Sequence, residues 1–124
     1  MKKTPTSRDL QAHLEAGGRF PEWSADDLRE VIPSEGIRQS VVAGLRPRLL
    51  AFFTEPLPGF SDAPKAPCAY LQFSAGYDVP ASQARQNGWP HRYMDAGHFH
   101  MLVDPASVAD AAISLVREAA AHRL

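Results

Sequence analysis

The stretch CAYLQFSAGYDVPASQARQNGWPHRYMD, residues 68–95, decides the fold of this chain. It begins with a short apolar run, residues 68–73, which is bounded by a proline and a Ser-Ala-Gly turn and therefore predicts a buried strand. Residues 79–87 then predict a short helix that stops at Gly88, and residues 89–95 predict a second strand. Because a helical crossover joins these two strands, we expect them to be parallel.

A longer amphipathic helix follows the second strand, after a loop at residues 96–103. Asp104 is expected to cap this helix, and Pro105 occupies its first position, where the missing N–H costs nothing. The predicted apolar face of the helix consists of Val108, Ala111, Ala112, Leu115, Val116 and Ala119. Two parallel strands are too few to form a complete sheet, so we expect one end of a doubly wound α/β sheet whose other strands are missing.

The first half of the chain predicts short helices separated by proline-rich loops. Ser24 and Asp27 form a capping pair that is typical of a helix start. The run LLAFF, residues 49–53, is either helix or strand, because periodicity cannot decide for so short a segment. The helices expected from apolar spacing and stop signals cover residues 8–16, 25–32 and 34–45.

The composition favours an ordinary soluble domain and argues against nucleic-acid and membrane partners. The chain has 124 residues, of which 44% are hydrophobic and 22% charged, as in an ordinary soluble domain or part of one. Its net charge of -1 and the absence of a basic stripe argue against a nucleic-acid partner. The N-terminus does not resemble a signal peptide, and no run approaches the ~18 apolar residues of a membrane span, so we expect a cytoplasmic protein with no membrane partner. Cys68, the single cysteine, is expected to be a small core residue.

Two chemically useful side chains follow the two predicted strands. Asp78 comes after the first strand, in FSAGYD, and His98 comes after the second, in DAGHFHM. In an open α/β sheet, functional groups collect at the carboxyl ends of the strands. An acid after one strand and a histidine after the next follow the order of an α/β-hydrolase triad, in which the nucleophile precedes both.

From Phe20 to its end, the chain resembles the C-terminal half of an α/β-hydrolase, specifically a small bacterial esterase-like member. The stretches that carry the resemblance are GGRFPEWSADDLR, PCAYLQFSAGYD, GWPHRYMDAGHFHMLVDP and the final helix. The resemblance implies a partial α/β-hydrolase fold, with a helical cap-like region at residues 1–60 and a strand–helix–strand–helix part of the core at residues 61–124. The cap aromatics that would shape an acyl pocket are Phe20, Trp23, Phe52 and Phe53.

The activity implied by the resemblance is acyl-ester hydrolysis. His98 would be the general base that takes a proton from a serine, and Asp78 would orient the imidazole and stabilise the imidazolium. The chain contains no G-x-S-x-G nucleophile elbow. The nearest match is GFSDA, residues 59–63, which lies between prolines and is not expected to follow a strand. We therefore expect a fragment or split form of a serine hydrolase that needs no cofactor or metal and, once completed, acts on a small ester or acyl substrate.

Two alternatives remain open. The chain could be a non-catalytic binding or regulatory module that pairs its exposed sheet edge with another chain, either a second copy of itself or a complementing N-terminal chain. It could also be a metal-dependent hydrolase that uses His91, His98 and His100, because a His-x-His pair at a strand end can chelate zinc. Against these functional readings, Asp78 could simply cap the helix beside it, and His100 is expected to be a packing residue.

Overall fold

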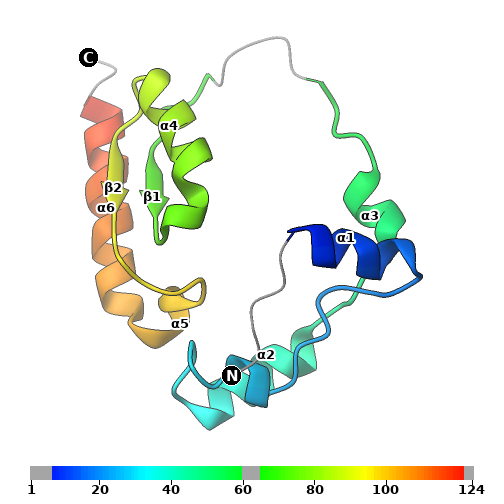
Figure 1. Cartoon of the computed structure of the whole chain (residues 1–124). Helices are drawn as coiled ribbons and strands as arrows, with labels where there is room; N and C mark the ends of the chain where they lie inside the picture. Colours follow the sequence, from blue (N-terminus) through cyan, green and yellow to red (C-terminus); the bar gives the residue numbers. More distant parts are fainter. Residues whose placement is uncertain (1–6, 60–64, 122–124) are drawn as a thin grey trace. The chain divides into compact units, whose positions relative to one another are not determined.

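The computed structural model describes residues 7–59 and 65–121. The chain divides into two units, residues 1–59 and residues 60–124. The described residues combine helices with a two-stranded parallel sheet, so the fold is mixed α/β. Along the chain of Figure 1 the elements are α1 (Ser7–Glu15), η1 (Asp26–Leu28), α2 (Glu35–Gly44), α3 (Leu50–Thr54), β1 (Tyr70–Gln72), η2 (Ala75–Tyr77), α4 (Asp78–Gln86), β2 (His91–Tyr93), α5 (His100–Val103) and α6 (Pro105–Ala121).

Helix α1 confirms the helix predicted in this part of the sequence. Two nested hydrogen bonds close its C-terminus: Gly17 N–H donates to Leu14 O at 3.0 Å, and Gly18 N–H donates to His13 O at 2.9 Å. Gly17 has a φ of +92°, the left-handed conformation that this helix end requires and that glycine adopts without steric cost. The glycine pair therefore ends the helix as its sequence predicts.

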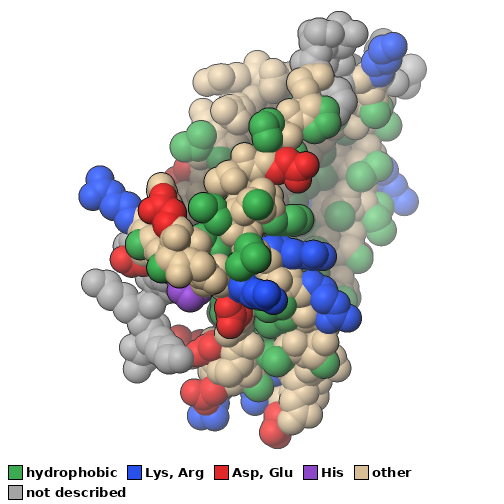
Figure 2. Space-filling view, turned by 90° about the vertical axis from the view of Figure 1, so that its right-hand side faces the viewer, with side chains coloured by type: hydrophobic (Ala, Val, Ile, Leu, Met, Phe, Trp, Pro, Cys, Tyr) green, Lys and Arg blue, Asp and Glu red, His purple; other side chains and the backbone are tan. Residues whose placement is uncertain are grey.

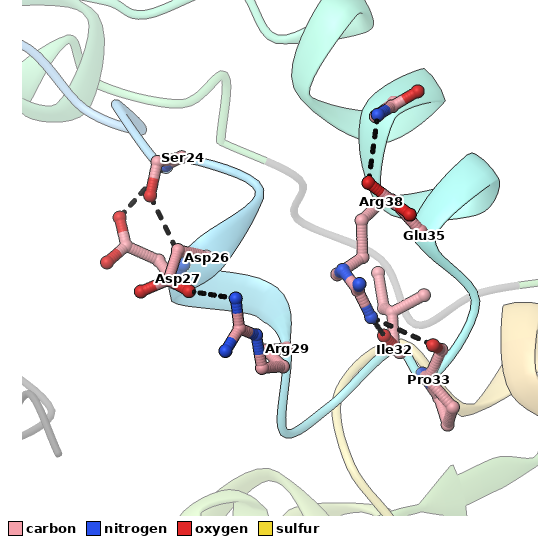
Figure 3. A network of polar contacts seen from close by, with 9 residues as sticks. Ser24, Asp26, Asp27, Arg29, Ile32, Pro33, Glu35 and Arg38 are labelled. Atoms are coloured by element: carbon pink, nitrogen blue, oxygen red, sulfur yellow. Dashed lines mark hydrogen bonds and ion pairs between the residues drawn. The ribbon is translucent and has the colours of Figure 1, made fainter.

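The predicted capping pair of the second segment is also present (Figure 3). Ser24 N–H donates to Asp27 Oδ2 at 2.9 Å, and Asp27 N–H donates to Ser24 Oγ at 3.2 Å. The helix expected over residues 25–32, however, is only the short 3-10 helix η1. A physical reason is the proline at position 33, because the residue before a proline is pushed out of the helical region and only a few residues remain after the cap.

Arg38 joins this turn to helix α2. Its Nη1 donates to Ile32 O at 2.7 Å and to Pro33 O at 2.8 Å, as Figure 3 shows. Ile32 itself is fully buried. Helix α2 confirms the predicted third helix, with Ser34 as its N-cap accepting from Ile37 N–H at 3.3 Å.

The ambiguous LLAFF run forms helix α3. The ring of Phe53 packs at an angle against Phe20, with 6.1 Å between ring centroids, and Phe20 packs edge-on against Trp23 at 5.6 Å. Phe52, the neighbour of Phe53, is 60% exposed. The aromatics implied to form a cap therefore cluster within the first unit, while their role in an acyl pocket stays a prediction.

Strands β1 and β2 confirm the predicted parallel pair. Leu71 lies opposite Arg92, and the pairing begins with Tyr70 N–H donating to Pro90 O at 2.9 Å. Each strand has three residues, fewer than the sequence predicted. Pro90, directly before β2, has no N–H to donate, and this limits the regular ladder at its start.

Helices α4 and α6 lie on opposite faces of this sheet. Arg85 of α4 reaches His91 of β2, with 3.5 Å between Nη1 and Nδ1. The next strand residue, Arg92, donates instead to Ser114 of α6 at 3.2 Å. Because neighbouring residues of a strand point to opposite faces, the two helices cover the two faces. The carboxyl ends of both strands consequently open onto the same edge of an α/β/α arrangement.

Helix α6 begins as predicted, but its buried face contains fewer residues than the apolar face predicted from the sequence. Ser107 donates to the Asp104 carboxylate through both its N–H, at 3.2 Å, and its hydroxyl, at 2.7 Å, which confirms the N-cap. The buried residues of the helix are Ala111, Leu115 and Ala119, whereas Ala112 is exposed and Val116 is 65% exposed. A sheet of two strands is too narrow to cover the wider apolar face that the sequence predicted.

The loop expected at residues 96–103 contains helix α5 instead. Its single turn is closed by Leu102 N–H donating to Phe99 O at 2.8 Å and by Asp104 N–H donating to His100 O at 2.9 Å. A helix of four residues is too short to show a 3.6-residue period, so the sequence pattern could not reveal it.

The surface carries charges of both signs. Figure 2 shows acidic and basic side chains interspersed with hydrophobic ones on the face that it draws. This mixture agrees with the net charge of -1. Within residues 7–59 and 65–121, no helix combines the length and the hydropathy required to span a membrane.

Candidate functional site

His98 and Tyr77 meet at the carboxyl edge of the sheet. Tyr77 ends the 3-10 helix that follows β1, and His98 lies in the loop that follows β2. The Tyr77 hydroxyl lies 3.3 Å from Nδ1 of His98, and the two rings are stacked, with 6.4 Å between centroids and 15° between planes. Both side chains are exposed. The structure therefore pairs the predicted general base with a tyrosine.

This contact suits a histidine that accepts a proton. If Nδ1–H donates to the Tyr77 hydroxyl, the lone pair of the neutral imidazole is on Nε2 of an exposed ring. The ring of Phe99 packs perpendicular to His98 with 5.1 Å between centroids and restricts it further. Tyrosine is neutral, so Tyr77 orients the imidazole but does not supply the negative charge of a triad acid.

Asp78 does not lie against His98. Its Oδ1 instead accepts a hydrogen bond from Gln72 Nε2 at 2.6 Å. Nor does Asp78 cap α4, because Tyr77 is the N-cap residue of that helix and its side chain makes no capping hydrogen bond. The structure therefore gives neither the predicted acid–histidine contact nor the predicted cap.

Gln72 is the residue that sequence reasoning missed. Its side chain is almost fully buried, at 2% exposure, in the last position of β1. Nε2 donates to Asp78 Oδ1 and also to Ser74 O at 2.9 Å, while Oε1 lies 2.8 Å from Nε2 of His91. The signal in the sequence was a glutamine inside an apolar strand, since a buried amide needs partners for both its ends.

The partners of Gln72 define its orientation. Ser74 O is an acceptor and so is an ionised Asp78, hence the amide nitrogen must face both. Oε1 then faces His91, and Nε2 of His91 must carry a proton in order to donate. The Nδ1 atom of this ring faces Arg85 at 3.5 Å, and the ring itself stacks on Tyr70 with 6.2 Å between centroids.

The three-histidine metal site does not form. His91 is engaged with Gln72, His98 is engaged with Tyr77, and the His100 ring packs edge-on against Phe73 at 6.0 Å. Throughout the part of the chain that the structure describes, no three His, Cys, Asp or Glu side chains come together in a group that could hold a metal ion. His100 thus takes the packing position that was expected of it.

Residues 60–64, which include the serine of GFSDA, lie outside the described residues. Cys68 is half-buried, and its thiol donates to Ala66 O at 3.4 Å. Near the histidine loop, the hydrogen bonds from the hydroxyl and the N–H of Ser107 lower the pKa of Asp104 below its usual value, and His100 lowers it further.

Comparisons of the chain with protein-family models, with curated proteins and with solved structures found no match. The α/β-hydrolase resemblance therefore stays a prediction, and only the geometry of the site supports a functional proposal.

Proposed function

We propose that this chain supplies the histidine part of an acyl-ester hydrolysis site of the α/β-hydrolase kind, with His98 as general base and Tyr77 as the residue that orients its ring. The observation that carries the proposal is the 3.3 Å contact between Tyr77 Oη and His98 Nδ1 at the carboxyl edge of a parallel sheet. That edge is where ligands and reacting groups gather in open α/β folds. A serine from another segment or another chain would complete the site.

In the chain as it stands, water takes the place of the serine. Nε2 of His98 accepts a proton from water while the water oxygen forms a bond to the acyl carbon of the ester. The tetrahedral intermediate then collapses, the bond from carbon to the leaving alkoxide or aryloxide breaks, and the imidazolium returns its proton to the leaving group or to solvent. The products are one carboxylic acid and one alcohol or phenol for each ester and water consumed.

The partner of His98 sets the expected strength of this activity. A triad carboxylate stabilises the imidazolium that forms during the reaction, but a neutral tyrosine does so only through its dipole. Preorganised oxyanion donors are often the largest catalytic contribution, and the proposed site relies on His98 and Tyr77 alone. We therefore expect weak hydrolysis of activated esters by this chain.

The test measures hydrolysis of p-nitrophenyl acetate by the wild-type chain, His98→Ala and His100→Ala. The chain has five histidines, so the other four provide a background that each variant must be compared with. We expect the second-order rate constant of His98→Ala to fall to that background, while His100→Ala keeps the wild-type value. Equal rate constants for the wild type and His98→Ala would disprove the proposal.

A second candidate function rests on the edge of β1. Parallel pairing directs the N–H and C=O of Tyr70 and Gln72 toward β2, so those of Leu71 point to the opposite side. No described residue pairs with Leu71 there, and an open strand edge is a template for another strand. We propose a second copy of the chain as occupant, because two β1 strands can pair antiparallel about a two-fold axis.

This pairing predicts a monomer–dimer equilibrium, so the apparent molar mass should rise toward twice the monomer value as the protein concentration increases. Light scattering during gel filtration should detect the dimer, and amide exchange at Leu71 should slow as the protein concentration rises. A monomer at all concentrations, with unchanged exchange at Leu71, would eliminate this candidate without affecting the hydrolysis proposal.

A further inference from the structure

We infer that Gln72 is a positioning residue, which holds the turn that places the Tyr77 hydroxyl against His98. This inference rests on the proposed function for its importance to hydrolysis, but its structural part can be tested independently. Gln72 itself is buried, and its side-chain hydrogen bonds go to Ser74, Asp78 and His91 rather than to His98. It acts on the site only through the residues on either side of Tyr77.

The amide nitrogen of Gln72 binds both ends of the turn between β1 and α4. It donates to Ser74 O at 2.9 Å, at the start of the turn, and to Asp78 Oδ1 at 2.6 Å, at its end. The same carbonyl of Ser74 accepts the N–H of Tyr77 at 3.1 Å. The backbone of Tyr77 is therefore fixed directly through its own N–H and indirectly through Ser74 and Asp78, the two residues of the turn that Gln72 binds.

The opposite end of the same amide is held by β2. His91 Nε2 lies 2.8 Å from Oε1 of Gln72, and because the amide nitrogen faces the turn, this ring nitrogen donates to the amide oxygen. If the amide were flipped, its oxygen would face Ser74 O and the Asp78 carboxylate, which are both acceptors. Ser74 O and Asp78 thus determine the direction in which Gln72 donates, and the N–H of His91 Nε2 fits the amide oxygen on the other side.

The His98 side of the site is anchored to the same strand end. Met94 N–H donates to Gln72 O at 2.8 Å, and Ala96 N–H donates to Phe73 O at 3.0 Å. These bonds fix the start of the loop that carries His98. The side chain of Gln72 and the backbone of Gln72 and Phe73 therefore hold the two sides of the Tyr77–His98 contact relative to one another.

Three substitutions separate this role from the orienting acid that the resemblance implies. Asp78→Asn retains an acceptor oxygen for Gln72, so we expect the Tyr77–His98 contact and the hydrolysis to be unchanged. If Asp78 were a triad acid, the same substitution would abolish the hydrolysis. Gln72→Glu retains the shape and the acceptor for His91 but sets an oxygen against Asp78 and Ser74 O. The double variant Gln72→Glu/Asp78→Asn restores a donor at position 78 that can bind the new carboxylate.

The structural readout is the cross-peak between the ring protons of Tyr77 and His98 in nuclear Overhauser spectra of protein with labelled rings. We expect this cross-peak in the wild type and Asp78→Asn, its loss in Gln72→Glu, and its partial return in the double variant, in which Ser74 O still faces an oxygen. The His98-dependent hydrolysis rate should follow the same order, with a loss of about ten-fold, because a misplacement of ~1 Å can cost up to ~100-fold in rate. Gln86→Glu, an exposed change on α4, is the matched control.

Circular dichroism shows whether each variant folds, and if Gln72→Glu unfolds, Gln72→Met, which removes the amide without adding a charge, takes its place. Retention of the cross-peak in a folded Gln72→Glu or Gln72→Met would overturn the inference, and so would its loss in Asp78→Asn. A wild type that shows the cross-peak but no His98-dependent hydrolysis would refute the proposed function alone. The two failures are therefore distinguishable in one set of variants.

Discussion

The side-chain nitrogen of Gln72 lies 2.6 Å from Oδ1 of Asp78, and this bond turns the carboxylate toward the end of β1. Tyr77, the residue just before Asp78, is consequently the one whose side chain meets His98. The site thus consists of an exposed histidine–tyrosine pair and a buried amide that hydrogen-bonds to the turn carrying the tyrosine.

The buried amide should contribute measurably to stability. Gln72→Leu removes the partners of Ser74 O and of Nε2 of His91 while keeping a side chain of similar size. Because leaving buried polar groups unsatisfied costs ~1–3 kcal/mol, we expect the free energy of unfolding to fall by about 2 kcal/mol. Urea titration followed by circular dichroism measures this change. The exposed control Gln86→Leu should alter stability by less than ~0.5 kcal/mol, and an equal effect in the two variants would contradict a structural role for Gln72.

The Tyr77 hydroxyl should matter for hydrolysis more than the Asp78 carboxylate does. Tyr77→Phe keeps the stacked ring but removes the oxygen that lies 3.3 Å from His98 Nδ1. Since one neutral hydrogen bond is worth ~1 kcal/mol, the His98-dependent rate constant for p-nitrophenyl acetate should fall about five-fold. Tyr93→Phe, another exposed tyrosine, should have no effect. Unchanged hydrolysis in Tyr77→Phe would mean that the hydroxyl does not orient the imidazole.

The end of helix α4 depends on a glycine. Gly88 has a φ of +75° and lies in open space, while Trp89 N–H and Gly88 N–H close the helix on Ala84 O and Arg85 O, both at 3.0 Å. Gly88→Ala should destabilise the protein by ~1–2 kcal/mol, because a Cβ disfavours the left-handed conformation. Gly44→Ala, at a helical position with no neighbouring atoms, should have the opposite sign, with a gain of up to ~1 kcal/mol. Thermal or urea unfolding of both variants measures the two signs, and destabilisation by both would refute the conformational explanation.

The N-cap of α6 should make stability depend on acidity. The hydrogen bonds from Ser107 lower the pKa of Asp104 in the folded protein below its usual 3.8, so the carboxylate stabilises the fold above that pH. This contribution disappears as the pH falls from 3.8 through the lower folded pKa. The melting temperature of Asp104→Ala should therefore lie below that of the wild type near neutral pH, and the difference should shrink in acid.

Glu118→Ala, a carboxylate near the other end of α6, is the control for this acid dependence. It removes one negative charge without removing the cap, so its effect on the melting temperature should not follow the same curve. A difference between the wild type and Asp104→Ala that stays constant from neutral pH to below the folded pKa would contradict the role of the ionised cap.

Local signals in the sequence predicted most of the secondary structure. Gly17 and Gly88 mark helix ends, and the Ser24–Asp27 pair and Asp104 make the hydrogen bonds expected of caps. These devices act over a few residues, so their geometry follows from the residues themselves. The same is true of the parallel pairing of β1 and β2, which the intervening helix imposes.

Features that depend on tertiary contacts were not predictable. The sequence order placed an acid and a histidine after consecutive strands, but spacing along the chain does not show which side chain of a turn faces the next loop. Asp78 and Tyr77 are adjacent in sequence. Gln72 forms a hydrogen bond with Asp78, and Tyr77 is therefore the residue whose side chain contacts His98. Likewise, the exposure of Val116 follows from the width of the sheet rather than from the amphipathic pattern of α6.

The central claim is that His98 acts as a general base. Its most direct test compares the rate of ester hydrolysis by the protein in light water with the rate in heavy water. The quantity to compare is the His98-dependent part of the p-nitrophenyl acetate rate, obtained by subtracting the rate of His98→Ala from that of the wild type. A general base moves a proton in the rate-limiting step, so this part should be slower in heavy water. A His98-dependent rate that is equal in both solvents, or that is absent, would contradict the account.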